Sequence, residues 1–174
     1  MTDAKIADAQ HGYEKGHSVA LAAHTGTNVI SQACGMEASL LGLSLEGYVI
    51  DNDMLGAILR SVRGLEVTDE TLSFETIAEV VAGEGHYLGH PRTLEGMTRD
   101  YLYPEVADRA SPSDWGDAGA TDVRERARVR ARRVLDEHYP NHLDPAADRR
   151  IRDRFNILLP REAMCARQVR ARDP

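Results

Sequence analysis

The strand content of this sequence constrains its fold more than any other feature. The segment Thr27–Cys34 (TNVISQAC) is short and β-branched, as a buried strand is, and Gly35 follows it. The stretch 65–70 (LEVTDE) is consistent with either a short edge strand or a loop. A single strand cannot form a sheet by itself. The strand is therefore expected to pair with another copy of this chain or with the rest of a larger α/β protein.

Helical periodicity accounts for most of the remaining chain. The clearest helix lies between Ser44 and Gly64, where Leu45, Tyr48, Val49, Leu55, Ile58, Leu59 and Val62 form one apolar face. A helix over residues 6–24 is expected to bury the face that carries Ala9, Tyr13, Gly16, His17, Ala20 and His24. Further helices are predicted from capping and first-turn residues, which are Ser73, Pro91, Asp122 and Asp144–Pro145.

Composition indicates a globular protein of ordinary size. The 174 residues suit one domain, and no run of about 18 apolar residues predicts a membrane span. The N-terminus lacks the basic and apolar regions of a secretory signal, and Cys34 and Cys165 lack metal-site spacing. A cytoplasmic location, with no metal site, is therefore expected.

Charge is unevenly distributed along the chain. Residues 1–120 carry a net charge of −12 and residues 121–174 a net charge of +5, largely from arginine. The arginines of residues 124–133 surround a helix that also has an apolar stripe, which indicates a solvated face or one that docks on the acidic remainder. Nucleic-acid binding is therefore not expected.

The loop after the predicted strand is the best-placed segment for binding a ligand. In α/β proteins the carboxyl ends of strands carry the ligand-contacting loops, and Gln32, Cys34, Met36 and Glu37 lie at this end. Glu37 either holds a cationic substrate by its charge or is an exposed loop carboxylate. Cys34 is a weak candidate for a nucleophile, because the local sequence fixes no histidine beside it.

Two polar residues interrupt the apolar face of the helix at 44–64. At about 100° per residue, Asp51 and Asn52 fall inside this face and Asp53 falls outside it. Buried polar side chains need partners. These two residues are therefore expected either to bond to neighbouring backbone or to brace a pocket from behind.

The segment Gly83–His90 contains the pattern E-x-H-x-x-G. This pattern differs only at its first position from the D-x-H-x-x-G pattern of corrinoid-binding domains. The flanking periodicity instead predicts a junction between two helices, which the glycines and Pro91 would separate. His86, Tyr87 and His90 are candidates for contact with a partner protein. A zinc site at His86 and His90 is disfavoured by Gly85 and Gly89.

Three stretches together resemble the trimethylamine methyltransferase family, in its branch that lacks pyrrolysine. They are TDAKIADAQHGYEK (2–15), GMEASLLGLSLEGYVIDNDM (35–54) and GEGHYLGHPRTLEGMTRDYLYPEVADR (83–109). The third departs from the family pattern, because Arg92-Thr93 stands where His-Thr is usual. The resemblance implies a TIM barrel that moves a methyl group from a methylated or quaternary amine, of the glycine-betaine type, to cob(I)alamin on a separate corrinoid protein. It implies no cofactor bound by this chain.

The resemblance also implies a division of the chain and a set of site residues. Such a barrel needs about 250 residues, so this chain resembles its C-terminal portion. Residues 1–120 would form partial βα units and edge helices, 121–160 the C-terminal helices, and 161–174 a frayed tail. Asp3, Gln32 and Glu37 would line the substrate pocket, with Asp51 and Asn52 behind them, and no catalytic acid or base is assigned. The alternative is a catalytically inactive, truncated barrel that self-associates as a helical assembly module.

Overall fold

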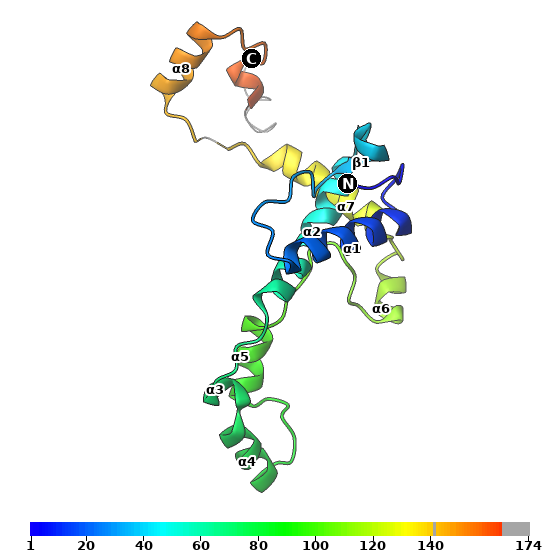
Figure 1. The fold of residues 1–174 in the computed structure, drawn as a ribbon, viewed down its shortest axis with the longest axis vertical. Helices are drawn as coiled ribbons and strands as arrows, with labels where there is room; N and C mark the ends of the chain where they lie inside the picture. Colours follow the sequence, from blue (N-terminus) through cyan, green and yellow to red (C-terminus); the bar gives the residue numbers. More distant parts are fainter. Residues whose placement is uncertain (141, 165–174) are drawn as a thin grey trace.

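A computed structural model of the protein describes residues 1–140 and 142–164. Its centre consists of three helices, α1 (Ala9–His24), α2 (Leu45–Arg63) and α7 (Val123–Glu137). α2 lies in the middle and contacts both of the others (Figure 1). The helices predicted over 6–24, over 44–64 and after Asp122 are therefore confirmed.

Local capping explains where these helices begin. The side chains of Asp8, Ser44 and Asp122 each accept a hydrogen bond from a backbone N–H in the first turn of α1, α2 and α7, respectively. α2 ends at Gly64, whose φ of 70° lies in the left-handed region that favours glycine. These signals are local, which is why the sequence predicts them.

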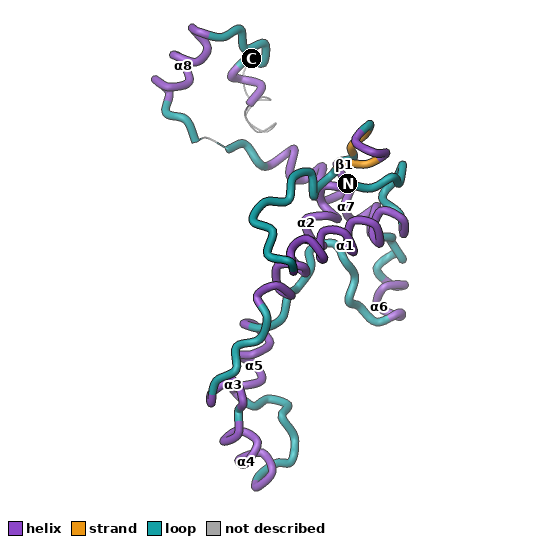
Figure 2. Tube along the Cα trace, in the orientation of Figure 1, coloured by secondary structure: helices purple, strands orange, loops and turns teal. Residues whose placement is uncertain are grey.

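The predicted strand at Thr27–Cys34 is wrong. This segment is a loop, and the only strands within residues 1–140 and 142–164 are β1 (Met36–Glu37) and β2 (Gly42–Leu43). They form an antiparallel hairpin, with Met36 opposite Leu43, around the 3-10 turn η1 (Ala38–Leu40) (Figure 2). A strand at 27–34 would need a neighbour to satisfy its backbone hydrogen bonds, and no other strand of the described residues lies beside it. Val29 is 80% exposed as a result.

A helical arm, residues 64–102, projects from the carboxyl end of α2 (Figure 1). It contains α3 (Asp69–Leu72), α4 (Phe74–Ala82) and α5 (Pro91–Arg99), so the helices predicted after Ser73 and from Pro91 are confirmed. Residues 65–68 are a loop. The arm exposes many apolar side chains. Little of the apolar surface of the arm is therefore buried against the body, which consists of α1, α2, α7 and the hairpin.

The remaining elements lie after the arm. α6 (Pro112–Asp117) falls in the Pro- and Gly-rich connection before α7, and α8 (Pro145–Arg154) confirms the helix predicted at Asp144–Pro145. The 3-10 turn η2 (Arg161–Met164) occupies the start of the predicted tail, and residues 165–174 of that tail lie outside the described residues. Among the helices described, none combines the length and apolar character needed to cross a membrane.

Candidate functional site

Four ionisable side chains are buried together between α1, α2 and the hairpin. His11 and Lys15 come from α1, Asp51 comes from α2, and Glu37 comes from β1. Lys15 and Asp51 are 0% exposed, His11 is 1% exposed and Glu37 is 4% exposed. Buried charges are rare unless they are paired, so this ionic cluster distinguishes the site from an ordinary apolar core.

Asp51 is the acceptor at the centre of the ionic cluster. Its Oδ2 accepts hydrogen bonds from Lys15 Nζ at 2.5 Å and from the backbone N–H of Gly35 at 2.7 Å, and its Oδ1 lies 2.8 Å from His11 Nε2. Burial alone would raise the pKa of Asp51, but these hydrogen bonds outweigh burial and hold that pKa below its ordinary value. One carboxylate thus ties α1, α2 and the loop before β1 together.

Glu37 forms the other side of the ionic cluster. Its Oε1 accepts a hydrogen bond from Ser44 Oγ at 2.8 Å and lies 3.3 Å from His11 Nδ1. His11 Nδ1 is buried and has no hydrogen-bond partner among the described residues. The imidazole therefore lies between two carboxylates. A Cβ on Gly47 would come within 2.8 Å of Glu37 Oε1, so only glycine leaves room for this arrangement.

The net charge of the ionic cluster depends on His11. Lys15 balances Asp51, and Glu37 lies beside the His11 ring. The formal charges sum to −1 with a neutral His11 and to zero with a protonated His11. Burial, and then the charge of Asp51, raises the pKa of the nearby Cys34 thiol, which makes it a poorer nucleophile.

The structure brings only some of the predicted pocket residues together. The exposed Asp3 accepts a hydrogen bond from Ser39 Oγ. The backbone pairs Ala38 N to Ala4 O (2.9 Å) and Ser39 N to Thr2 O (3.1 Å) hold this N-terminal segment beside the hairpin that carries Glu37. Gln32, by contrast, is exposed in the 27–34 loop, with a left-handed φ of 57°.

The orientation of α2 differs from the predicted one. Asp51 is buried as predicted, but its partners come from α1 and from Gly35 and not from neighbouring backbone. The prediction that Asn52 lies in the buried face is wrong, because Asn52 is exposed. Asp53, which was placed outside that face, accepts hydrogen bonds from the backbone N–H groups of Glu105, Val106 and Ala107. α2 therefore has contacts with the rest of the chain on a wider face than its apolar residues alone predict.

Sequence reasoning missed His11 and Lys15. The predicted inner face of α1 is wrong, since Tyr13 is 65% exposed and His17 and His24 are also exposed. The buried residues of α1 are His11, Lys15 and Val19, which are spaced at i, i+4 and i+8. The sequence offers one signal for this face. A histidine and a lysine four residues apart could pair with the carboxylate that is predicted inside the apolar face of α2.

The segment Gly83–His90 lies on the arm between α4 and α5, as predicted. His90 caps α5, because its Nδ1 accepts a hydrogen bond from Arg92 N at 3.2 Å. His86 and Tyr87 are exposed, and their contact with a partner protein stays a prediction. Within the part of the chain that the structure describes, no group of three His, Cys, Asp or Glu residues could hold a metal ion.

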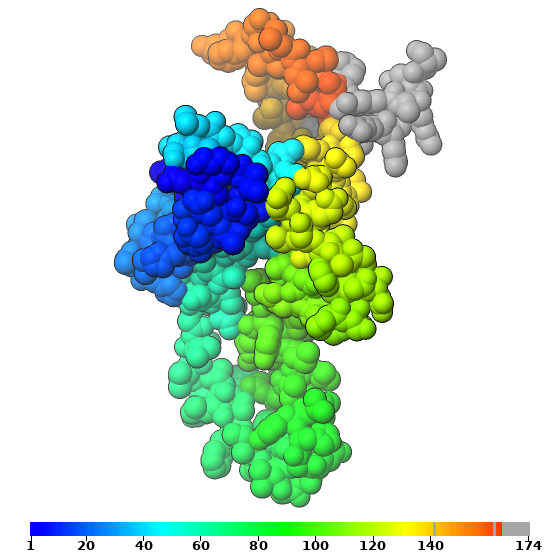
Figure 3. All heavy atoms as spheres, turned by 90° about the vertical axis from the view of Figure 1, so that its right-hand side faces the viewer, coloured from blue at the N-terminus to red at the C-terminus, as the bar shows by residue number. Residues whose placement is uncertain are grey.

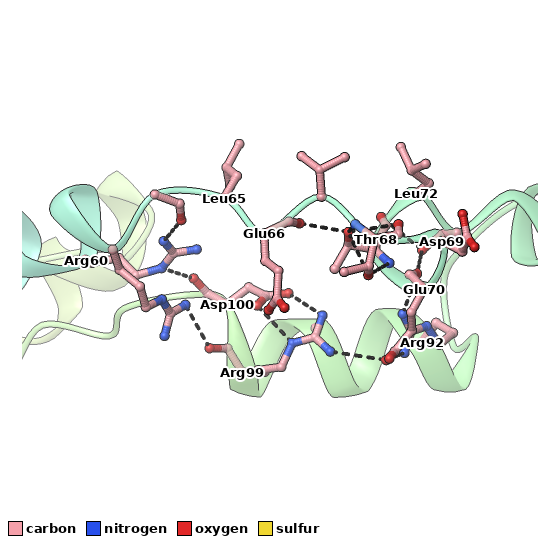
Figure 4. A pocket seen from close by; sticks show the side chains of 16 residues that line it. Arg60, Leu65, Glu66, Thr68, Asp69, Glu70, Leu72, Arg92, Arg99 and Asp100 are labelled. Atoms are coloured by element: carbon pink, nitrogen blue, oxygen red, sulfur yellow. Dashed lines mark hydrogen bonds and ion pairs between the residues drawn. The ribbon is translucent and has the colours of Figure 1, made fainter.

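The arm also carries a groove of about 1160 Å³ between residues 64–73 and α5 (Figure 4). Two of its arginines are already paired with carboxylates. Arg92 Nη1 lies 2.8 Å from Glu70, and Arg99 Nε lies 3.0 Å from Asp100. The groove contains no predicted site residue, so the ionic cluster is the better candidate site.

Comparison with known proteins agrees with the motifs of this chain. Residues 1–157 match the family described as Trimethylamine methyltransferase (MTTB). The chain is 27% identical over 151 residues to a glycine betaine methyltransferase of Desulfitobacterium hafniense, covering 87% of this chain and 31% of that protein. It is 34% identical over 144 residues to a trimethylamine methyltransferase of Methanosarcina thermophila, covering 82% of this chain and 29% of that protein. The chain thus spans about a third of the length of these relatives, and it belongs to the trimethylamine methyltransferase family.

Proposed function

We propose that this chain is the C-terminal part of a corrinoid-dependent methyltransferase with a TIM-barrel fold. The enzyme would move a methyl group from a methylated or quaternary amine to cob(I)alamin carried by a partner corrinoid protein. The observation that carries the proposal is the family match over residues 1–157, combined with a buried ionic cluster that holds two carboxylates inside the matched region. The two relatives are named for methyl transfer, one from glycine betaine and one from trimethylamine.

The chemistry of the substrate explains what the protein has to do. When a methyl group leaves a quaternary ammonium, the C–N bond breaks and its electron pair stays on nitrogen, so a neutral amine departs without a proton donor. The corrinoid supplies the nucleophile that accepts the methyl group. The protein has to hold a cation in line with that nucleophile. A quaternary amine needs no catalytic acid for this step, whereas trimethylamine must carry a proton on nitrogen so that dimethylamine leaves neutral.

The residues near the hairpin suit this task. Ser44 holds the nearly buried Glu37 by a hydrogen bond, and a negative charge on Glu37 would act on a cation at the edge of the hairpin across a region of low dielectric. Asp3 is exposed on the segment beside the hairpin and is available for direct contact. Asp51 would act indirectly, because it holds the loop at Gly35 in place. The missing barrel units would come from a longer polypeptide or from another chain.

A second candidate function is a non-catalytic module that self-associates. The apolar side chains exposed on the arm favour it, because a surface of this kind marks an interaction site. The two candidates differ in a measurable way, since only the first predicts methyl transfer.

Methyl transfer tests the proposal directly. The chain, and a version extended upstream by its missing barrel units, would be mixed with a reduced corrinoid protein and with glycine betaine or trimethylamine. Loss of the cob(I)alamin absorbance would report transfer. We expect transfer by the extended version, and a higher KM for the amine in Glu37→Gln but not in the control Glu84→Gln on the exposed arm. No transfer from either amine by the extended version would refute the proposal, and an unchanged KM in Glu37→Gln would refute the role of Glu37.

A further inference from the structure

The arm presents an apolar stripe that nothing in the described residues covers. On α4, Phe74, Ile77 and Val81 are spaced at i, i+3 and i+7 and therefore share one face. Their side chains are 78%, 43% and 75% exposed. Aromatic and branched side chains at this spacing are the anchors by which a helix docks in a groove. The stripe thus has the form of one half of an interface.

The arm is also strongly acidic. Residues 64–102 contain eight acidic and two arginine side chains, a net charge of −6. Glu75 and Glu79 lie on α4 itself, beside the apolar stripe. Two arms packed against each other would bring these like charges together, which costs free energy. The partner surface for the stripe should therefore be apolar in the middle and basic at its edges.

The same chain carries a groove that has two valines and three arginines among its lining residues. The α7 groove, of about 430 Å³, is lined by Glu105, Val106, Thr121, Glu125, Arg126, Val129, Arg130 and Arg133. Val106 lies at its floor, 3% exposed, and Val129 is 61% exposed. Arg130 pairs with Glu105 at 2.6 Å, and Arg126 donates hydrogen bonds to the carbonyls of Val106 and Thr121. The third arginine of the groove, Arg133, is exposed. α7 as a whole has six arginines against three acidic residues.

The arm of one chain does not lie against its own α7. α7 packs on α2 in the body, whereas α4 lies at the far end of the arm from it (Figures 1 and 3). The two matching surfaces are therefore available to another molecule. In a pair of copies that exchange arms, both contacts are made twice, as a closed dimer requires.

We propose that the acidic, apolar face of α4 docks in the α7 groove of a second copy of this chain. Phe74, Ile77 and Val81 contact Val106 and Val129, and the glutamates of α4 lie beside Arg133. This inference deepens the second candidate function, self-association, by naming the two surfaces involved. It does not rest on the methyl-transfer proposal.

A mixing experiment tests the pairing of these two surfaces. Light scattering of the purified chain should give at least twice the 19.2 kDa chain mass. Phe74→Asp on the arm and Val129→Asp in the groove should each weaken association at least tenfold. An equimolar mixture of the two variants should regain part of the association, because a mixed pair makes one of the two contacts between unchanged surfaces. Raising the salt from about 0.05 M to about 0.5 M should weaken association, because salt screens the charges.

Control variants distinguish docking of a second copy from other ways in which the apolar stripe of α4 could be covered. Val29→Asp changes a valine that is 80% exposed and lies outside both surfaces, and this variant should associate like the wild type. If circular dichroism shows that an Asp variant has lost helix, Phe74→Ser and Val129→Ser replace the pair. A wild-type chain of single mass, or single variants that still associate, would overturn the proposal. A mixture that fails to regain association would also overturn it, in favour of arm–arm pairing or of a covering segment from a longer polypeptide.

Discussion

Replacing Asp51 with alanine is the most direct test of how the ionic cluster is held together. The change removes the acceptor of Lys15 Nζ, of the Gly35 N–H and of His11 Nε2 at once. Lys15 is 0% exposed, so its ammonium group would stay buried without a counter-charge. Breaking a buried ion pair by removing one partner costs about 3–5 kcal/mol. We therefore expect Asp51→Ala to lower the free energy of unfolding by about that amount.

Urea denaturation followed by circular dichroism measures this free energy. The double variant Asp51→Ala/Lys15→Met should be more stable than Asp51→Ala alone, because it removes the unpaired ammonium group of Lys15 from the interior. Asp117→Ala, at an exposed carboxylate, should change the free energy of unfolding by less than about 0.5 kcal/mol. A loss below about 1 kcal/mol in Asp51→Ala, or a double variant less stable than Asp51→Ala, would refute the reasoning.

Three further substitutions test the contacts of Asp51, Glu37 and Asp53. The folded protein lowers the pKa of Asp51, so the stabilising contribution of this carboxylate is fully present above its ordinary pKa of 3.8. The contribution is lost as the pH falls through the lower pKa of the folded state. Urea titrations between about pH 3 and pH 7 should therefore show that the free energy of unfolding falls less with acid in Asp51→Asn than in the wild type. Gly47→Ala should lower the free energy of unfolding by about 1–3 kcal/mol, because the added Cβ meets Glu37 and Ser44. Gly12→Ala, with open space around the added Cβ, should raise it by up to about 1 kcal/mol. Equal shifts of the melting temperature in the two variants would contradict this. Asp53→Ala should cost about 1–3 kcal/mol, because three backbone N–H groups lose their acceptor, and Asn52→Ala should be nearly neutral by the same denaturation assay.

Loss of the Thr27–Cys34 strand shows where sequence reasoning fails for this protein. β-branched composition gives a segment the capacity to be a strand, but a strand exists only where a neighbour completes its hydrogen bonds. The described residues offer no such neighbour, and the segment is a loop. The predicted pocket residue Gln32 consequently lies on a surface loop, away from the position that a strand end would have given it.

The sequence by itself determined the helices of this protein, because their signals are local. Ser44, Asp122 and Asp144 cap helices within three residues of themselves, and apolar spacing marks the length of α2. The motifs also indicated the family. Only the tertiary structure decided which faces are buried, since that depends on the rotation of α1 against α2. The contacts of Asp51 with His11 and Lys15 cross 40 and 36 residues of chain, and no local pattern specifies them.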